Sequence, residues 1–198
     1  MGLELLYIKG QTPINEEEKE GLRIETINSQ SDLDEFEQLN IEESLQWIFA
    51  KKFKPQQVFT EKFICNLHKR MYGNVWAWAG KFRKTEKNIG VKQYQIPTQL
   101  KNLCDDALFW IENNTYTAEE IAVRFKHRIV SIHCFPNGNG RHSRLMADII
   151  IEKLFHKKPF SWGAGNLSKE SNTRKEYIKA VKEADNNKYQ PLLDFANS

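Results

Sequence analysis

The sequence contains few cysteines, and the three that it has form no pattern. Cys65, Cys104 and Cys134 are an odd, widely spaced set with no CxxC pair among 198 residues. This spacing excludes a disulfide framework, and no group of His, Cys and Asp residues has the spacing of zinc ligands. Unpaired cysteines are typical of a reducing compartment, so we expect a cytoplasmic protein.

Long hydrophobic runs and an excess of one charge are also missing. No run of about 18 apolar residues is present, and the opening MGLELLYIKG is too short and too polar for a signal peptide, so we expect no membrane contact. The net charge is +3, with basic residues interleaved among acidic ones, which argues against nucleic acid as a partner. With 40% hydrophobic and 28% charged residues, the chain suits one compact globular domain.

Helix signals fill most of the chain. We predict an irregular segment over residues 1–30, whose acidic stretch NEEEKEG reads as a solvated loop, and a single domain over 31–198. Helices are expected over residues 31–50, 60–72, 98–113, 117–132, 168–184 and 191–196, with a further one that carries Arg141 in its first turn and runs to 155. Residues 73–97 have glycines and no helical period, which predicts a short β-hairpin or an ordered flap. The fold class is therefore all-α with one small β insertion.

The stretch HCFPNGNGRHSR, from His133 to Arg144, contains the break between two of these helices. Glycines that alternate with asparagine allow successive backbone N–H groups to converge on an anion. They lead into a helix N-terminus, which also favours an anion. Arg141 and Arg144 lie three residues apart on one face of the first turn. Two arginines there oppose the helix dipole unless an anionic ligand compensates them.

His133 ends the preceding helix, where its imidazole can reach a ligand held by the loop. Histidine titrates near neutrality and is the usual general base in proteins. The residues thus predict a polyphosphate cradle with a base beside it. The alternative is a simple turn between helices, with the arginines as surface charges.

The whole stretch resembles the signature of the Fic (Fic/Doc, Fido-domain) family, HxFx(D/E)GNGRxxR. The matching positions are His133, Phe135, Gly138, Asn139, Gly140, Arg141 and Arg144. WAGKFRKTEKNIG and RKEYIKAVKEADNNKYQPLLDF extend the resemblance to about residues 30–196, and FPNGNGRHSRLMADII is similar to the subgroup called mobile mystery protein B. The resemblance implies a Fic-type helical bundle. It also implies a protein adenylyltransferase, an enzyme that transfers AMP from ATP to a Ser, Thr or Tyr hydroxyl of a target protein or of itself.

The resemblance also assigns roles to individual residues. His133 would deprotonate the target hydroxyl, and Phe135 would pack in the core and hold the loop. The groups expected to bind nucleotide are the N–H groups of Gly138, Asn139 and Gly140, the side chains of Arg141 and, for the γ-phosphate, Arg144, and the nucleoside-lining Tyr177. Flap residues Lys87, Asn88 and Ile89 would align a target segment by strand-like pairing.

Asn137 departs from the family pattern, which has an acid here that binds Mg²⁺. The amide carbonyl of asparagine is a poorer ligand for a hard dication, so Mg²⁺ would be held mainly by ATP, or the donor would differ. Two alternatives follow. A Doc-type phosphotransferase is disfavoured by the intact loop from Gly138 to Arg141, and a non-catalytic nucleotide- or protein-binding module is favoured by Asn137.

Glu37 lies in the middle of an apolar helical stripe that runs from Leu33 to Ile48, whereas Glu35 points away. A carboxylate on a buried face is costly unless a cation pairs with it. The resemblance implies an inhibitory glutamate that reaches the second arginine of the motif, so Arg144 is the predicted partner of Glu37. The alternative is a structural glutamate satisfied elsewhere.

Other histidines are expected to be peripheral. His68 is expected at a helix end, His127 on a helix surface, and His142 facing solvent. Trp76 and Trp78 are expected to anchor the packing beside the flap.

Overall fold

The computed structural model describes residues 12–164, 167 and 171–198. Its helices are α1 (Glu16–Lys19), α2 (Gln30–Phe49), α3 (Pro55–Val58), α4 (Glu61–Tyr72), α5 (Ile96–Glu112), α6 (Ala118–Ile132), α7 (Asn139–Ile149), α8 (Asn172–Asp185) and α9 (Gln190–Asn197). A π-helical turn, Ile150–Leu154, extends α7, and 3₁₀ turns cover Gln93–Gln95 and Trp162–Ala164. The predicted all-α class is confirmed.

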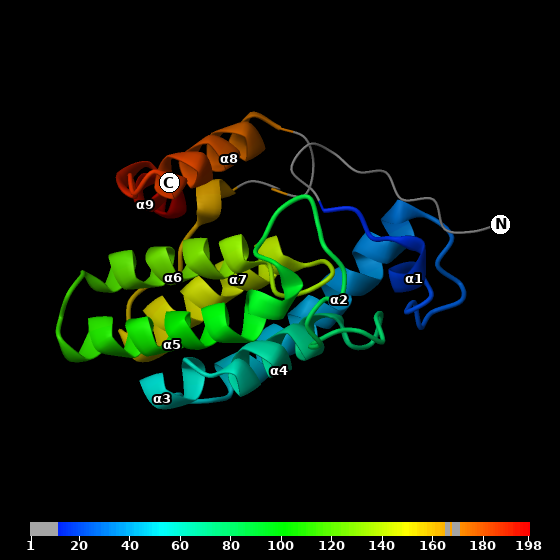
Figure 1. The fold of residues 1–198 in the computed structure, drawn as a ribbon, viewed down its shortest axis with the longest axis horizontal. Coiled ribbons are helices and arrows are strands. Elements are labelled where there is room, and N and C mark those ends of the chain that lie inside the picture. The colour runs from blue at the N-terminus through cyan, green and yellow to red at the C-terminus, as the bar shows by residue number, and fades with distance from the viewer. Residues whose placement is uncertain (1–11, 165–166, 168–170) are drawn as a thin grey trace.

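The helices form a bundle with a smaller C-terminal pair along one side, next to α6 (Figure 1). In the bundle, α2 packs on α4, α5 on α6, and α6 on α7, while α8 and α9 pack on each other. The largest fully buried side chains are Trp76, Tyr72, Phe125, Lys126, Phe135, Ile64 and Leu67. The turn between α6 and α7 contributes Phe135 to this core. Within the described residues, no helix is both long and apolar enough to cross a membrane.

Local capping sets the beginnings of the helices. Thr117 caps α6 in a reciprocal arrangement with Glu120, and Thr60 caps α4. The prediction of a loop in the acidic N-terminal stretch is wrong, because Asn15 and Glu18 cap each other's backbone N–H groups and start the short helix α1. Glu18 itself is buried.

The flap, residues 81–95, is an irregular loop, and the predicted β-hairpin does not form. The isolated bridge between Leu22 and Trp76 is the β pairing found in the described part of the chain. In a hairpin, the backbone carbonyls of each strand accept hydrogen bonds from the N–H groups of the other strand. Here the Arg83 guanidinium binds the carbonyls of Thr85 and Val91 instead. The flap, the green loop in Figure 1, arches beside the turn between α6 and α7.

Candidate active site

The turn between α6 and α7, residues 133–138, has an unusual backbone. His133 ends α6 in the left-handed region, at φ 58° and ψ 62°, and Gly138 precedes α7 at φ 78°. A Cβ at Gly138 would lie 2.6 Å from a ring carbon of Tyr72, so the position requires glycine. The catalytic turn, as we call residues 133–138, is thus held tightly against α4.

The side chain of Asn139 closes the catalytic turn. Its amide donates to the Phe135 carbonyl (2.8 Å), and its oxygen accepts from the Phe135 N–H (3.0 Å). Phe135 is fully buried and stacks on His68 with ring centroids 3.8 Å apart. The predicted packing role of Phe135 is confirmed. Gly140 follows Asn139 in the first turn of α7.

His133 is buried, with 4% of its surface exposed, yet neither ring nitrogen has a hydrogen-bond partner among the described residues. Burial, followed by the positive charge of Arg83, lowers its pKa to about 4. The imidazole is therefore neutral at physiological pH and can accept a proton. A buried imidazole with both nitrogens free is expensive unless it serves a ligand.

Arg141 faces α2, where it forms an ion pair with Glu37 (2.5 Å). The same carboxylate accepts a hydrogen bond from the indole N–H of Trp76 (2.6 Å), and Glu37 is only 4% exposed. The predicted burial of Glu37 is confirmed, but its predicted partner, Arg144, is wrong. Arg144 lies three residues further along α7 and approaches α8 instead of Glu37.

Arg144 instead lies near Tyr177 of α8, with its guanidinium carbon 5.6 Å from the ring centroid. Lys126 Nζ approaches the same ring to 4.6 Å, and Lys126 is fully buried. Burial raises the pKa of Tyr177, but the charges of Lys126 and Arg144 outweigh it and lower the pKa overall. The structure thus brings together two predicted nucleotide-binding residues. Sequence reasoning missed Lys126, although its spacing from Ala122 and Ile129 places it on the apolar face of α6.

The three predicted target-binding residues of the flap differ in their surroundings. Asn88 and Ile89 are exposed. Lys87 pairs with Glu18 of α1 (2.5 Å) and donates to the carbonyl of Pro13 (3.0 Å). One of the three is therefore engaged within the chain, while the other two are open to a partner.

Asn137 does not offer a free metal ligand. Its side-chain oxygen accepts the Gly138 N–H (2.6 Å), and its amide donates to the carbonyl of Thr12 (3.0 Å). Nor do the described residues include any group of three or more His, Cys, Asp or Glu side chains that could hold a metal ion. The residues present thus do not fit a Mg²⁺ ion held by the protein alone. The Gly138 N–H, predicted to bind phosphate, is occupied by Asn137.

Three histidines expected at the periphery are buried, so these expectations are wrong. His68 accepts a hydrogen bond from the Gly80 N–H (3.0 Å) and forms another with the carbonyl of Asn137 (3.0 Å). The second bond connects α4 to the catalytic turn. His142 forms a hydrogen bond with the Ile64 carbonyl, and His127 forms hydrogen bonds with the side chains of Asp185 and Tyr189. These partners are distant in the sequence, so local patterns do not reveal them. Trp76 is buried, as expected.

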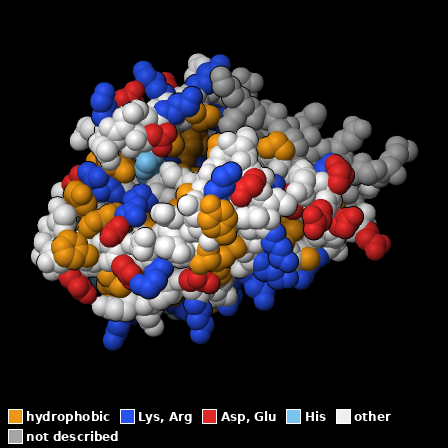
Figure 2. All heavy atoms as spheres, in the orientation of Figure 1, with side chains coloured by type: hydrophobic (Ala, Val, Ile, Leu, Met, Phe, Trp, Pro, Cys, Tyr) orange, Lys and Arg blue, Asp and Glu red, His pale blue; other side chains and the backbone are white. Residues whose placement is uncertain are grey.

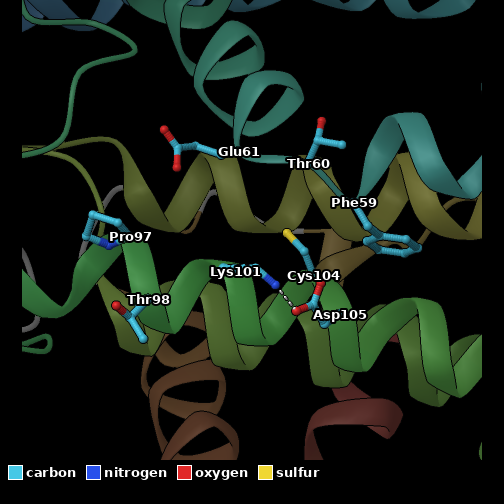
Figure 3. A pocket seen from close by; sticks show the side chains of 8 residues that line it. All are labelled: Phe59, Thr60, Glu61, Pro97, Thr98, Lys101, Cys104 and Asp105. Carbon is cyan, nitrogen blue, oxygen red and sulfur yellow. Dashed lines mark hydrogen bonds and ion pairs between the residues drawn. The ribbon is translucent and has the colours of Figure 1, made fainter.

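Two hollows on the surface differ in their relation to this site. Figure 2 shows a recess containing hydrophobic side chains between α8 and the flap, on the side where the catalytic turn lies. A second hollow, of about 390 Å³, lies between the start of α4 and α5 (Figure 3). Its lining is Phe59, Thr60, Glu61, Pro97, Thr98, Lys101, Cys104 and Asp105, and no residue of the motif contributes. The first recess is therefore the one that fits a ligand of the motif.

Comparison with known proteins matches the chain to the model of the Fic/DOC family over residues 58–151. A similar protein is Protein adenylyltransferase Fic of Nematostella vectensis, 22% identical over 85% of this chain and 39% of its own length. Protein adenylyltransferase fic-1 of Caenorhabditis elegans is 31% identical over 44% of this chain and 18% of its own length. This chain thus spans well under half of these relatives.

Solved structures agree with the sequence match. BepC of Bartonella tribocorum, determined with bound AMPPNP, superposes with a TM-score of 0.68 at 17% identity, over 92% of this chain and 97% of BepC. Fic-1 of C. elegans superposes with a TM-score of 0.65 at 23% identity, over 80% of this chain and 46% of the Fic-1 chain. The matched segment contains both the flap and the catalytic turn. The chain thus has a fold similar to that of Fic domains, and its HxFxxGNGRxxR loop lies in the segment that matches the Fic/DOC family model.

Proposed function

We propose that this chain transfers AMP from ATP to a hydroxyl side chain of a target protein. The observation that carries the proposal is His133, a buried and neutral imidazole whose two nitrogens lack partners, directly before a helix N-terminus with two arginines. The names of the adenylyltransferase relatives and the AMPPNP bound to BepC support ATP as the donor.

In this reaction His133 removes the proton of the target hydroxyl. The hydroxyl oxygen then bonds to the α-phosphorus as the bond to the β-phosphate oxygen breaks, and pyrophosphate leaves. The N–H groups of Asn139 and Gly140 and the guanidinium of Arg144 stabilise the charge that develops on the phosphates. Tyr177 lines the nucleoside side of the site. Mg²⁺ enters with the ATP phosphates, because Asn137 has no free ligand atom.

The Glu37–Arg141 pair supports an autoinhibited resting state. A carboxylate at 2.5 Å compensates the charge of this guanidinium and so weakens its attraction for phosphate. ATP therefore competes with Glu37 for Arg141, and release of Glu37 from α7 activates the enzyme.

The target is a protein with an exposed Ser, Thr or Tyr, which contacts the flap at Asn88 and Ile89, and self-modification is part of the proposal. Free cysteines support a cytoplasmic location. The sequence of the loop supports the assignment of this chain to the mobile mystery protein B subgroup. Neither a membrane nor a nucleic acid belongs to the proposed reaction.

Mass spectrometry after incubation with ATP and Mg²⁺ tests the proposal, with the purified chain as its own acceptor and with an added lysate as a source of targets. A gain of one AMP that is absent in His133→Ala supports it. A gain of phosphate would indicate the Doc-type phosphotransferase. ATP binding without any modification would indicate a non-catalytic module.

A further inference from the structure

Arg83 lies at the base of the flap, is 3% exposed, and directs its guanidinium at the catalytic turn. Its Nε donates to the carbonyl of His133 (2.7 Å). The two terminal nitrogens donate to the carbonyls of Thr85 (2.9 Å) and Val91 on either side of the flap. One side chain therefore ties together both limbs of the flap and the backbone of the base.

Backbone contacts reinforce this connection on both sides of His133. The Arg83 N–H donates to the carbonyl of Cys134 (2.9 Å), and the Val91 N–H donates to that of Ile132 (3.3 Å). At Gly90, φ is 104°, and a Cβ there would lie 2.6 Å from the Cβ of His133. The flap backbone thus lies directly on the histidine.

His133 needs such support for two reasons. Its left-handed φ of 58° is uncommon for a residue with a side chain, so neighbouring contacts must hold it. Neither ring nitrogen has a hydrogen-bond partner of good geometry among the described residues, so polar contacts orient the imidazole only weakly. What remains is the hydrogen bond on its carbonyl and the packing of the flap.

We propose that Arg83 is a positioning residue for the base: it holds the backbone of His133 in its left-handed conformation and keeps the flap closed over the imidazole. The inference rests on the proposed function, in which His133 takes the proton of the target hydroxyl. Arg83 touches neither substrate nor the reacting atoms, and it acts through His133.

The charge of Arg83 has a second effect on the same residue. All three of its acceptors within the turn and flap are neutral carbonyls, and the nearest carboxylate, Glu86, is 3.9 Å away and half-exposed. The other cation near His133 is Lys87, whose charge is compensated by Glu18. Cys134, also adjacent, stays a neutral thiol because burial raises its pKa. Arg83 therefore disfavours protonation of His133 and keeps it available as a base.

Two substitutions separate the contacts from the charge. Arg83→Lys keeps a cation but cannot reach three carbonyls, because an ammonium lacks the planar fork of a guanidinium. Arg83→Gln removes the charge as well. Lys84→Gln is the matched control, since Lys84 is an exposed cation next to Arg83 in the flap.

We expect kcat to fall about 10- to 100-fold in both Arg83 variants, as for other misplaced catalytic groups, with the Kd for ATP unchanged. The imidazole of His133, followed by NMR, should titrate at higher pH in Arg83→Gln than in the parent protein or in Arg83→Lys. The acidic limb of the pH–rate profile should shift with it. Hydrogen exchange at the Val91 amide should accelerate in both variants, and Lys84→Gln should resemble the parent in every measurement.

A lower melting temperature with unchanged kcat and unchanged His133 titration would show Arg83 to be merely structural. If Arg83→Gln does not fold, Arg83→Lys decides alone, since full kcat in that variant overturns the positioning role. Failure of the proposed function looks different: the parent would bind ATP without modifying any protein. The NMR titration and the exchange at Val91 would still test the clamp on His133.

Discussion

Two arginines near the catalytic turn, Arg141 and Arg83, make different kinds of contact. On the α2 side, Arg141 meets the carboxylate of Glu37 at 2.5 Å. On the flap side, Arg83 donates its hydrogen bonds to carbonyl oxygens of the turn and the flap, and the carboxylate of Glu86 is 3.9 Å away. The first cation is neutralised, whereas the second keeps its charge beside His133. An arginine side chain can therefore form an exchangeable contact or a permanent one, depending on its acceptor.

An ion pair is exchangeable because another anion can replace its carboxylate with little change in charge. Phosphate is such an anion, and it also forms charge-assisted hydrogen bonds with guanidinium. No ligand of this reaction can replace three backbone carbonyls, because they belong to the fold itself. The α2 side is therefore suited to regulation, and the flap side is suited to holding the base.

The largest expected effect comes from removal of the group that the flap side holds. His133→Ala should lower the rate of AMP transfer by about 10²- to 10⁴-fold, the usual contribution of a general base. ATP affinity, measured by calorimetry, should stay unchanged, because the anion site lies on α7. An equal loss of binding and turnover would mean that His133 shapes the nucleotide site instead.

Low pH should destabilise the fold through two buried histidines. Burial holds the pKa of His133 and of His142 near 4, below the ordinary value of 6.5. Each neutral imidazole thus contributes stability that is complete above about pH 6.5 and is lost as the pH falls toward 4, by about 3 kcal/mol for each group. Urea unfolding at several pH values measures this loss.

His133→Ala should make the dependence of the unfolding free energy on pH shallower between pH 6.5 and 4. His156→Ala, which removes an exposed histidine, should leave it unchanged. A slope that is identical in all three proteins would exclude His133 as a source of the acid sensitivity.

Breaking the α2 side should increase activity. Glu37→Gln removes the charge opposite Arg141 but keeps an oxygen that can accept from Trp76. A freed guanidinium offers phosphate a charged hydrogen bond worth about 1.5–3 kcal/mol, so ATP affinity should rise by about tenfold or more. Calorimetry and AMP incorporation measure the two effects.

Glu35→Gln is the matched control, because Glu35 is exposed on the same helix. A fall in melting temperature without tighter ATP binding would identify Glu37 as a structural charge only. Activation by Glu35→Gln but not by Glu37→Gln would contradict the assignment of the α2 side.

The smallest effect is expected at the centre of the turn, between the two sides. Asn137→Asp removes the amide that donates to the Thr12 carbonyl and adds a charged oxygen ligand. The Mg²⁺ concentration for half-maximal activity should fall, because a carboxylate binds this hard cation better than an amide does. Faster hydrogen exchange around Thr12 should accompany it. An unchanged Mg²⁺ midpoint would exclude position 137 from metal binding.

Much of the fold and part of the site follow from the sequence alone, for local reasons. Helix caps such as Thr117 with Glu120 join residues three apart, so the chain near them suffices to predict the helix. The glycines of the motif act through their own backbone, and Gly138 has the positive φ that the pattern suggested. Periodicity likewise predicted that Glu37 is buried, because the face of a helix depends only on spacing.

Only the tertiary structure decided which groups meet. That Glu37 pairs with Arg141 rather than Arg144 depends on where α2 crosses α7, and the sequence of neither helix contains that information. The flap is a loop rather than a hairpin because the Arg83 guanidinium binds the carbonyls of Thr85 and Val91, and the same group reaches the His133 carbonyl 50 residues away. His68 could be buried only because backbone groups of Gly80 and Asn137 satisfy both of its nitrogens. Sequence patterns determine a residue's own conformation and burial, whereas partners distant along the chain become known only when the chain is folded.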